Sequence, residues 1–161
     1  MADIVDRQTR SRMMAGIRAR DTQPEMLLRR ALHARGYRYR LCDKRLPGKP
    51  DMVFTRFRAV IFVHGCFWHG HAACRLFRLP KSNTAFWQGK IAGNMIRDRV
   101  VLEDLYAAGW RVMIVWECAL KGKSAISLEN LLVIVSNWLD SETKFHEIRG
   151  GYDERKDGNF V

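Results

Sequence analysis

The sequence has no apolar stretch approaching the roughly 18 residues that a membrane-spanning helix needs. Its N-terminus also lacks the hydrophobic segment of a secretory signal peptide, so we expect a cytoplasmic protein. Cysteines are few, at four in 161 residues. Because thiols stay reduced in the cytoplasm, metal binding or catalysis is a more direct use for them than a disulfide framework.

Acidic side chains are also scarce, with 17 Asp and Glu against 28 Lys and Arg and a net charge of +11. Most of the excess lies in residues 1–58, which carry 15 basic and 6 acidic side chains. A basic surface of this kind favours a polyanionic partner such as DNA. We expect one domain over residues 1–140, with a basic DNA-contacting arm over 1–20 and a polar, flexible tail over 141–161.

The spacing of apolar residues predicts an α/β protein with a mixed β-sheet and helices on both of its faces. A gap of only three residues between two apolar runs favours an antiparallel hairpin. The predicted elements are helices over 8–20 and 22–36, strands over 37–41, 52–55 and 59–63, a helix over 84–108, a strand over 110–116 and a helix over 127–139.

The segment 64–83 has no periodicity, yet it holds three of the five histidines and two of the four cysteines. With Cys118, which follows the 110–116 strand, the residues Cys66, His71 and Cys74 would form a tetrahedral zinc site with no open position, and hence a structural one. The alternative is that these are buried thiols and core histidines. Cys42 is left over and is expected to be a small core residue.

Asp51 follows a proline at the start of a short strand, and the returning strand ends at His64. A carboxylate at such a position can bind Mg²⁺, which prefers oxygen ligands. The alternative is ordinary turn chemistry for an Asp after Pro. His64 and His69 are free for acid or base catalysis. Glu25 and Asp98 could join them, although Glu25 also suits a helix cap.

Large aromatic residues flank the same segment. Phe67 and Trp68 lie between two of the expected zinc ligands, and Phe86 and Trp87 open the next helix. Exposed aromatic side chains on a metal-stiffened loop of a basic protein suggest wedges between DNA bases. The alternative is a hydrophobic patch that packs the loop onto the sheet.

Several segments together resemble the very short patch repair (Vsr) endonuclease family over about residues 1–140. They are Arg20 to Thr22 with Glu25, Leu46 to Asp51, Val60 to His69, Phe86 to Trp87, Asn94 to Arg99 and Gly109 to Cys118. The resemblance implies a restriction-endonuclease-like fold, a variant of the PD-(D/E)xK core. It also implies Mg²⁺-dependent nicking of DNA 5′ of a thymine mispaired with guanine, a lesion left by deamination of 5-methylcytosine.

By matched position, the resemblance has Asp51 and the main-chain carbonyl of Val63 hold Mg²⁺, with His64 and Asp98 orienting the attacking water. His69, partnered by Glu25, would transfer protons. The implied DNA-intercalating residues are Phe67, Trp68 and Trp87, and the implied zinc ligands are Cys66, His71, Cys74 and Cys118.

The family context implies a monomer that acts on double-stranded DNA with a T:G mismatch. DNA polymerase I and ligase would complete the repair, a cytosine-5 methyltransferase would work in the same cell, and mismatch-repair proteins are further candidate partners. The chain departs from the usual nuclease signature, because Phe62 and His64 stand where its glutamate and lysine are expected. Two alternatives remain: a zinc-stabilised DNA-binding module without catalysis, and a nicking endonuclease of different specificity.

Overall fold

A five-stranded sheet organises the computed structural model, which describes residues 6–15 and 21–151. The strands lie in chain order, β1 to β5, across the sheet. The first two pairings are antiparallel and the last two are parallel, so the predicted mixed sheet is confirmed. The strands are β1 (Arg40–Leu41), β2 (Met52–Phe54), β3 (Ala59–His64), β4 (Arg111–Trp116) and β5 (Phe145–Ile148).

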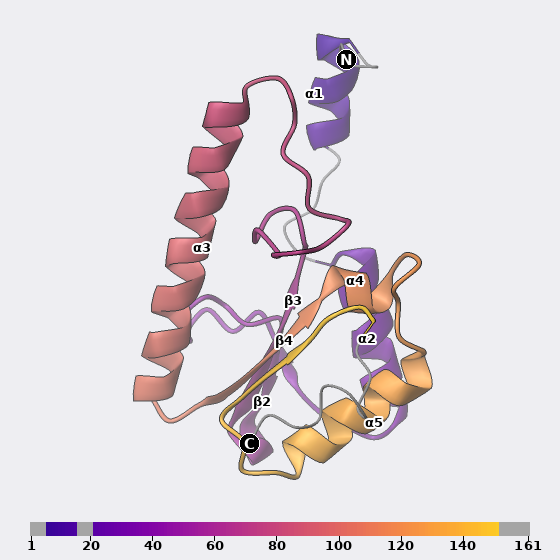
Figure 1. The fold of residues 1–161 in the computed structure, drawn as a ribbon. Coiled ribbons are helices and arrows are strands. Elements are labelled where there is room, and N and C mark those ends of the chain that lie inside the picture. The colour runs from indigo at the N-terminus through magenta and orange to yellow at the C-terminus, as the bar shows by residue number, and fades with distance from the viewer. Residues whose placement is uncertain (1–5, 16–20, 152–161) are drawn as a thin grey trace.

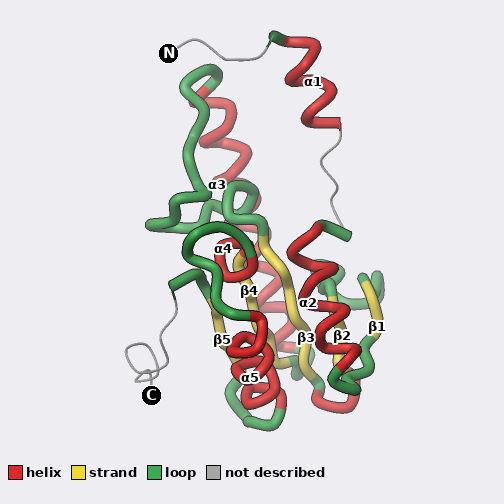
Figure 2. The backbone as a smooth tube through the Cα atoms, turned by 90° about the vertical axis from the view of Figure 1, so that its right-hand side faces the viewer, coloured by secondary structure: helices red, strands yellow, loops and turns green. Residues whose placement is uncertain are grey.

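Helices cover both faces of this sheet. The helix α3 lies along one face, and α2, α4 and α5 lie on the other, while α1 stands apart from the sheet in both views (Figures 1 and 2). Among the described residues, no helix is both long enough and apolar enough to cross a membrane. The helices are α1 (Arg7–Ala15), α2 (Gln23–Ala34), α3 (Thr84–Ala107), α4 (Glu117–Leu120) and α5 (Leu128–Leu139), with a 3₁₀ turn, η1 (Thr55–Phe57), between β2 and β3.

The helix starts follow local sequence signals. The Thr22 hydroxyl accepts a hydrogen bond from the Glu25 amide, and the Ser127 hydroxyl accepts one from the Asn130 amide, as N-caps do. These two predicted starts are confirmed. The basic helix expected over 8–20 is present as α1, and residues 16–20 lie outside the described part of the chain.

The two central strands are buried on both faces, which explains their continuous apolar runs. Leu28 and Leu32 of α2 pack with Ile61 on one side of the sheet. On the other side, Leu105 of α3 packs with Val60. Successive side chains of β3 therefore point alternately into two hydrophobic cores, one on each side of the sheet.

Two sequence expectations are wrong in part. The strand expected over 37–41 pairs only at β1, and Tyr39, just before the pairing begins, packs its ring against Phe54 with 5.5 Å between centroids. The flexible tail expected from residue 141 contains β5, which pairs with β4. Its buried Ile148 and half-buried Phe145 suffice for an edge strand, although its neighbours are polar.

Arg111, at the start of β4, joins three parts of the fold. Its guanidinium donates hydrogen bonds to the carbonyls of Trp138 (3.0 Å), Leu139 (2.9 Å) and Phe57 (3.1 Å). It also lies 4.7 Å from the centre of the Trp138 ring. The Trp138 carbonyl also accepts from the Ser141 amide and hydroxyl, whereas the Leu139 carbonyl at the end of α5 has no donor within the helix and depends on Arg111.

We expect Arg111→Met to lower the free energy of unfolding by about 2–4 kcal/mol, because it removes the donor to the Leu139 and Phe57 carbonyls and the contact with the Trp138 ring. Urea denaturation measures the change. The matched control is Arg58→Met, since exposed Arg58 donates to a single carbonyl, that of Ala108, and should cost less than about 1 kcal/mol. Equal losses in the two variants would contradict this role for Arg111.

Candidate active site and metal centre

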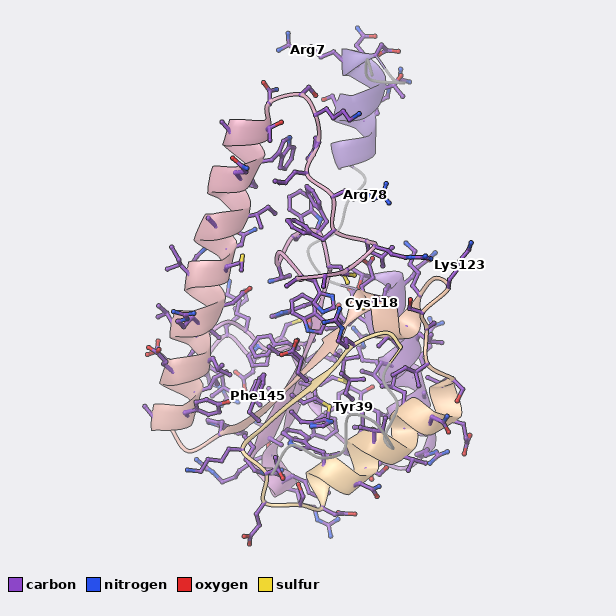
Figure 3. The ribbon with its side chains drawn as sticks, in the orientation of Figure 1. Arg7, Tyr39, Arg78, Cys118, Lys123 and Phe145 are labelled. Carbon is purple, nitrogen blue, oxygen red and sulfur yellow. The ribbon has the colours of Figure 1, made fainter. Side chains whose placement is uncertain are left out.

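The parallel register of β3 and β4 places two cysteines at equivalent positions. His64 pairs with Trp116 at the ends of these strands, and Cys66 and Cys118 each follow two residues later. His71 and Cys74 come from the loop after β3, and the four candidate ligand atoms lie within 4.8 Å of one another. The structure thus brings together the four residues that the sequence grouped. Figure 3 labels Cys118 within this region.

The donor set fits a tetrahedral zinc ion. For Zn–S and Zn–N bonds of about 2.3 and 2.0 Å, tetrahedral geometry separates sulfur and nitrogen by about 3.5 Å. The Cys118 sulfur and His71 Nδ1 are 3.6 Å apart. Burial lowers the pKa of His71 to about 4, which keeps the imidazole in its neutral, metal-binding form. Burial raises the pKa of the Cys66 and Cys118 thiols, a cost that a bound cation would reverse.

The chain after β5 clamps this cluster from behind. The Arg149 guanidinium donates to the carbonyls of Ala72 (3.2 Å) and Ala73 (3.1 Å), and the Gly150 amide donates to the Cys118 sulfur at 3.2 Å. A Cβ on Gly150 would lie 2.5 Å from the Cys118 carbonyl oxygen, so only glycine fits. No sequence motif marks this contact, because it depends on where β5 joins the sheet.

Asp51 stands at the start of β2, where the antiparallel pairing with β3 brings it to Val63. The Val63 amide donates to Asp51 Oδ2 at 2.7 Å. In an antiparallel ladder the amide and carbonyl of one residue face the same neighbour, so the Val63 carbonyl also points toward this edge. Both residues line a cleft of about 420 Å³.

The cleft carries charge that favours a cation. Burial raises the pKa of Asp51 to about 7 against the opposing Val63 hydrogen bond, and the Glu25 carboxylate raises it further. Glu25 is only 2% exposed. Two carboxylates held this close in a buried place repel each other unless a proton or a cation lies between them, so the donor set fits a divalent metal ion.

Two histidines and a second carboxylate line the other wall of the cleft. The rings of His64 and His69 stack with centroids 3.8 Å apart and planes 3° from parallel. His69 Nδ1 lies 2.7 Å from Asp98 Oδ2, so α3 supplies the carboxylate partner of the histidine. Burial lowers the pKa of His64 to about 3, which leaves its imidazole neutral.

The expected pairing of His69 with Glu25 is replaced by the pairing with Asp98. Glu25 Oε2 instead accepts from the Asp21 amide at 2.8 Å, and Oε1 accepts from Arg29 at 3.3 Å. The reason is topological, because Glu25 lies on α2 and Asp98 on α3, on opposite faces of the sheet.

Aromatic residues of the loop after β3 and of the start of α3 form one cluster. The ring of Phe67 lies 5.1 Å from Trp68 and 5.5 Å from Trp87, with 5.9 Å between the two tryptophans. Phe86 is 63% exposed beside them. The Asn94 side chain donates to the Trp68 carbonyl at 2.8 Å, which ties the loop to α3. All three clustered rings remain half-buried and accessible.

Cys42, expected in the core, is half-buried and lines the cleft with Asp51. Lys44 and Lys49 line the same cleft. They supply positive charge where a phosphate backbone would approach. No sequence signal places these residues in the cleft, because their position depends on how β1 pairs with β2.

Comparison with known proteins decides the family. The sequence model of the family described as DNA mismatch endonuclease Vsr matches residues 2–75. Over 142 residues, 88% of this chain and 90% of the relative, the sequence is 46% identical to DNA mismatch endonuclease Vsr of Escherichia coli (strain K12). The chain belongs to the Vsr family. The resemblance seen in the sequence and the expected enzyme class, a DNA endonuclease, are confirmed.

Other relatives of this Vsr-family chain are nicking enzymes. It is 46% identical to the type II nicking enzyme V.XorIIP of Xanthomonas oryzae pv. oryzae, over 82% of this chain and 98% of that one. It is 45% identical to the type II nicking enzyme V.NmeAIP of Neisseria meningitidis serogroup A, over 88% and 99%. The similarity therefore extends over most of each relative.

We expect Cys118→Ser to weaken zinc binding at least about tenfold, because one of four ligands is lost. Residues 64–83 should then become more sensitive to proteolysis. Metal analysis of the purified protein measures zinc directly, with Asp43→Asn, outside the groups of candidate ligands, as the control that keeps its zinc. Full zinc content in Cys118→Ser would contradict the assignment.

We expect Asp51→Asn to stabilise the protein in buffer without Mg²⁺. The folded-state pKa of Asp51, about 7, exceeds its unfolded value of 3.8, so its contribution to stability falls as pH rises from about 4 to 7. At pH 8 the variant should gain about 1–2 kcal/mol, and the gain should shrink toward pH 5. Thermal unfolding at both pH values measures it.

The control for this prediction is Asp43→Asn. Hydrogen bonds from Arg45 lower the pKa of Asp43 to about 2, so removing that carboxylate should bring no gain at pH 8. Equal shifts in the two variants would show that the effect comes from net charge alone.

Proposed function

We propose that this protein nicks double-stranded DNA on the 5′ side of a thymine mispaired with guanine, with Mg²⁺ as the catalytic ion. The observation that carries the proposal is the meeting of Asp51 with the His64, His69 and Asp98 group in one cleft, with a cluster of accessible aromatic rings that includes Trp68, the residue before His69. The similarity to a mismatch endonuclease and to nicking enzymes supports it.

In this proposal Asp51 and the Val63 carbonyl hold Mg²⁺. The ion, when bound, would polarise the scissile phosphate and lower the pKa of water. Asp98 holds His69 through Nδ1, which leaves Nε2 as the atom that exchanges a proton with the substrate. His64, kept neutral by burial, stacks on His69 and orients it and the attacking water.

The proposed reader of the mismatch is the aromatic cluster. Phe67, Trp68 and Trp87 enter the base stack beside the weak T:G pair. Unstacking costs a few kcal/mol per base step, so the loop that carries these three rings must be rigid. The proposed structural zinc ion at Cys66, His71, Cys74 and Cys118 supplies that stiffness.

The proposed fold relationship is to restriction endonucleases, as a PD-(D/E)xK variant. In support, Asp51 opens the hairpin of β2 and β3 in a mixed sheet, and His64 ends β3. The protein would act as a monomer on lesions left by 5-methylcytosine deamination. DNA polymerase I and ligase would follow it, and a cytosine-5 methyltransferase and mismatch-repair proteins would work in the same cell.

We expect the protein to nick a T:G duplex only when Mg²⁺ is present, and to leave the matched T:A and C:G duplexes intact. Asp51→Ala should abolish nicking and retain DNA binding, and His69→Ala should slow nicking by about 10²–10⁴-fold. Gel analysis of end-labelled strands measures the rate and shows which strand is cut. Asp43→Asn is the matched control outside the cleft.

Two results would favour the alternatives. Binding without nicking by the unsubstituted protein would indicate a DNA-binding module. Equal nicking of other mismatches, or of paired DNA, would indicate a nicking endonuclease of different specificity, as the nicking-enzyme relatives allow.

A further inference from the structure

Cys42 lies beside Asp51 because of strand register. In the antiparallel pairing of β1 with β2, Leu41 faces Met52. This is the last pair of the ladder, so Cys42 directly follows it and Asp51 directly precedes Met52. Cys42 has a φ of 45°, which turns the chain out of the strand at this point. Cys42 and Asp51 both line the cleft, where a sulfur atom therefore stands next to the carboxylate of the proposed Mg²⁺ site.

Three donor atoms from three segments converge here. The candidate ligand atoms of Glu25, Cys42 and Asp51 lie within 4.8 Å of one another. With metal–oxygen bonds of about 2.1 Å and metal–sulfur bonds of about 2.5 Å, an oxygen and a sulfur bound to one ion lie at most about 4.6 Å apart, and two oxygens at most about 4.2 Å. The 4.8 Å limit on the three atoms is close to these values, so a small side-chain movement brings them around one ion.

The chemistry of this donor set differs from that of an all-oxygen site. Thiolate sulfur selects soft divalent ions, whereas Mg²⁺ binds through oxygen. Glu25 is held in place by the Asp21 amide and by Arg29, which also moderates its charge. The sulfur of Cys42 therefore shifts the preference of this site from Mg²⁺ toward soft divalent ions.

We propose that Cys42, with Asp51 and Glu25, binds a thiophilic divalent cation such as Cd²⁺, Zn²⁺ or Co²⁺, and that this ion excludes Mg²⁺ from Asp51. On binding, the thiol releases its proton to solvent and the sulfur donates an electron pair to the ion. The inference rests on the proposed function in one respect, because Asp51 belongs to both sites. It makes Zn²⁺ stabilising at the four-ligand cluster and inhibitory in the cleft.

The test uses Cd²⁺ on the zinc-loaded, full-length protein. Iodoacetamide alkylation of Cys42, followed by mass spectrometry of its peptide, reports on that one thiol. We expect Cd²⁺ to slow alkylation at least tenfold in the unsubstituted protein and in Asp43→Asn, and to have no such effect in Asp51→Asn. Mg²⁺ at the same concentration should not protect Cys42.

A second measurement is needed if Cys42 reacts slowly with iodoacetamide even without Cd²⁺. Cd²⁺ bound to thiolate gives an ultraviolet charge-transfer absorption, and the unsubstituted protein should show more of it than Cys42→Ser, whose other three cysteines are intact. A third measurement is inhibition, because Cd²⁺ should inhibit Mg²⁺-dependent nicking at least tenfold more weakly in Cys42→Ser, relative to the activity of that variant without Cd²⁺.

The outcomes separate the two proposals. Equal charge-transfer absorption in the unsubstituted protein and Cys42→Ser, or protection that persists in Asp51→Asn, would overturn the sulfur site. Mg²⁺-dependent nicking would then still support the proposed function. Protection of Cys42 that depends on Asp51, in a protein that never nicks, would support the metal site and overturn the endonuclease proposal.

Discussion

The in-register parallel pairing of β3 with β4 is the constraint on which the rest of the structure depends. Parallel strands end at the same edge of a sheet, so the residues that follow them must meet there. His64 enters the cleft from this edge, and Cys66 and Cys118 meet just beyond it. Because β2 runs antiparallel to β3, Asp51, the residue just before β2, reaches the same edge from the other direction. A shift of one residue would separate both groups.

Bringing these side chains together in a buried place costs electrostatic free energy. Asp51 and Glu25 lie together in a buried place, and the raised pKa of Asp51 measures the resulting cost. Cys66, His71 and Cys118 are also buried, with pKa values shifted toward their neutral forms. A cation at either place would turn a destabilising group of ligands into a stabilising one. The same buried polarity that weakens the metal-free fold therefore suits it for metal chemistry.

Local signals and strand order could be predicted from the sequence much better than long-range contacts. Thr22 caps α2 and the hairpin follows from a three-residue gap, since both depend on neighbours in the chain. The pairing of His69 with Asp98, the position of Cys42 and the clamp by Arg149 could not be predicted. Each depends on how distant elements pack: α3 on the sheet, β1 on β2, and β5 on β4. β5 itself was missed because an edge strand needs few apolar residues.

The loop between β3 and α3 links recognition to chemistry. Trp68 and His69 are adjacent in the chain, so any movement of the loop shifts the aromatic cluster together with the imidazole proposed to transfer protons. Asn94 holds the Trp68 carbonyl and Asp98 holds the His69 ring, and both anchors lie on α3, four residues apart and hence on one face. In the proposed reaction, the position of the wedge in the base stack therefore sets the phosphate that reaches Asp51. Specificity for a strand position then follows from the rigidity of this loop, with no need for separate contacts to each base.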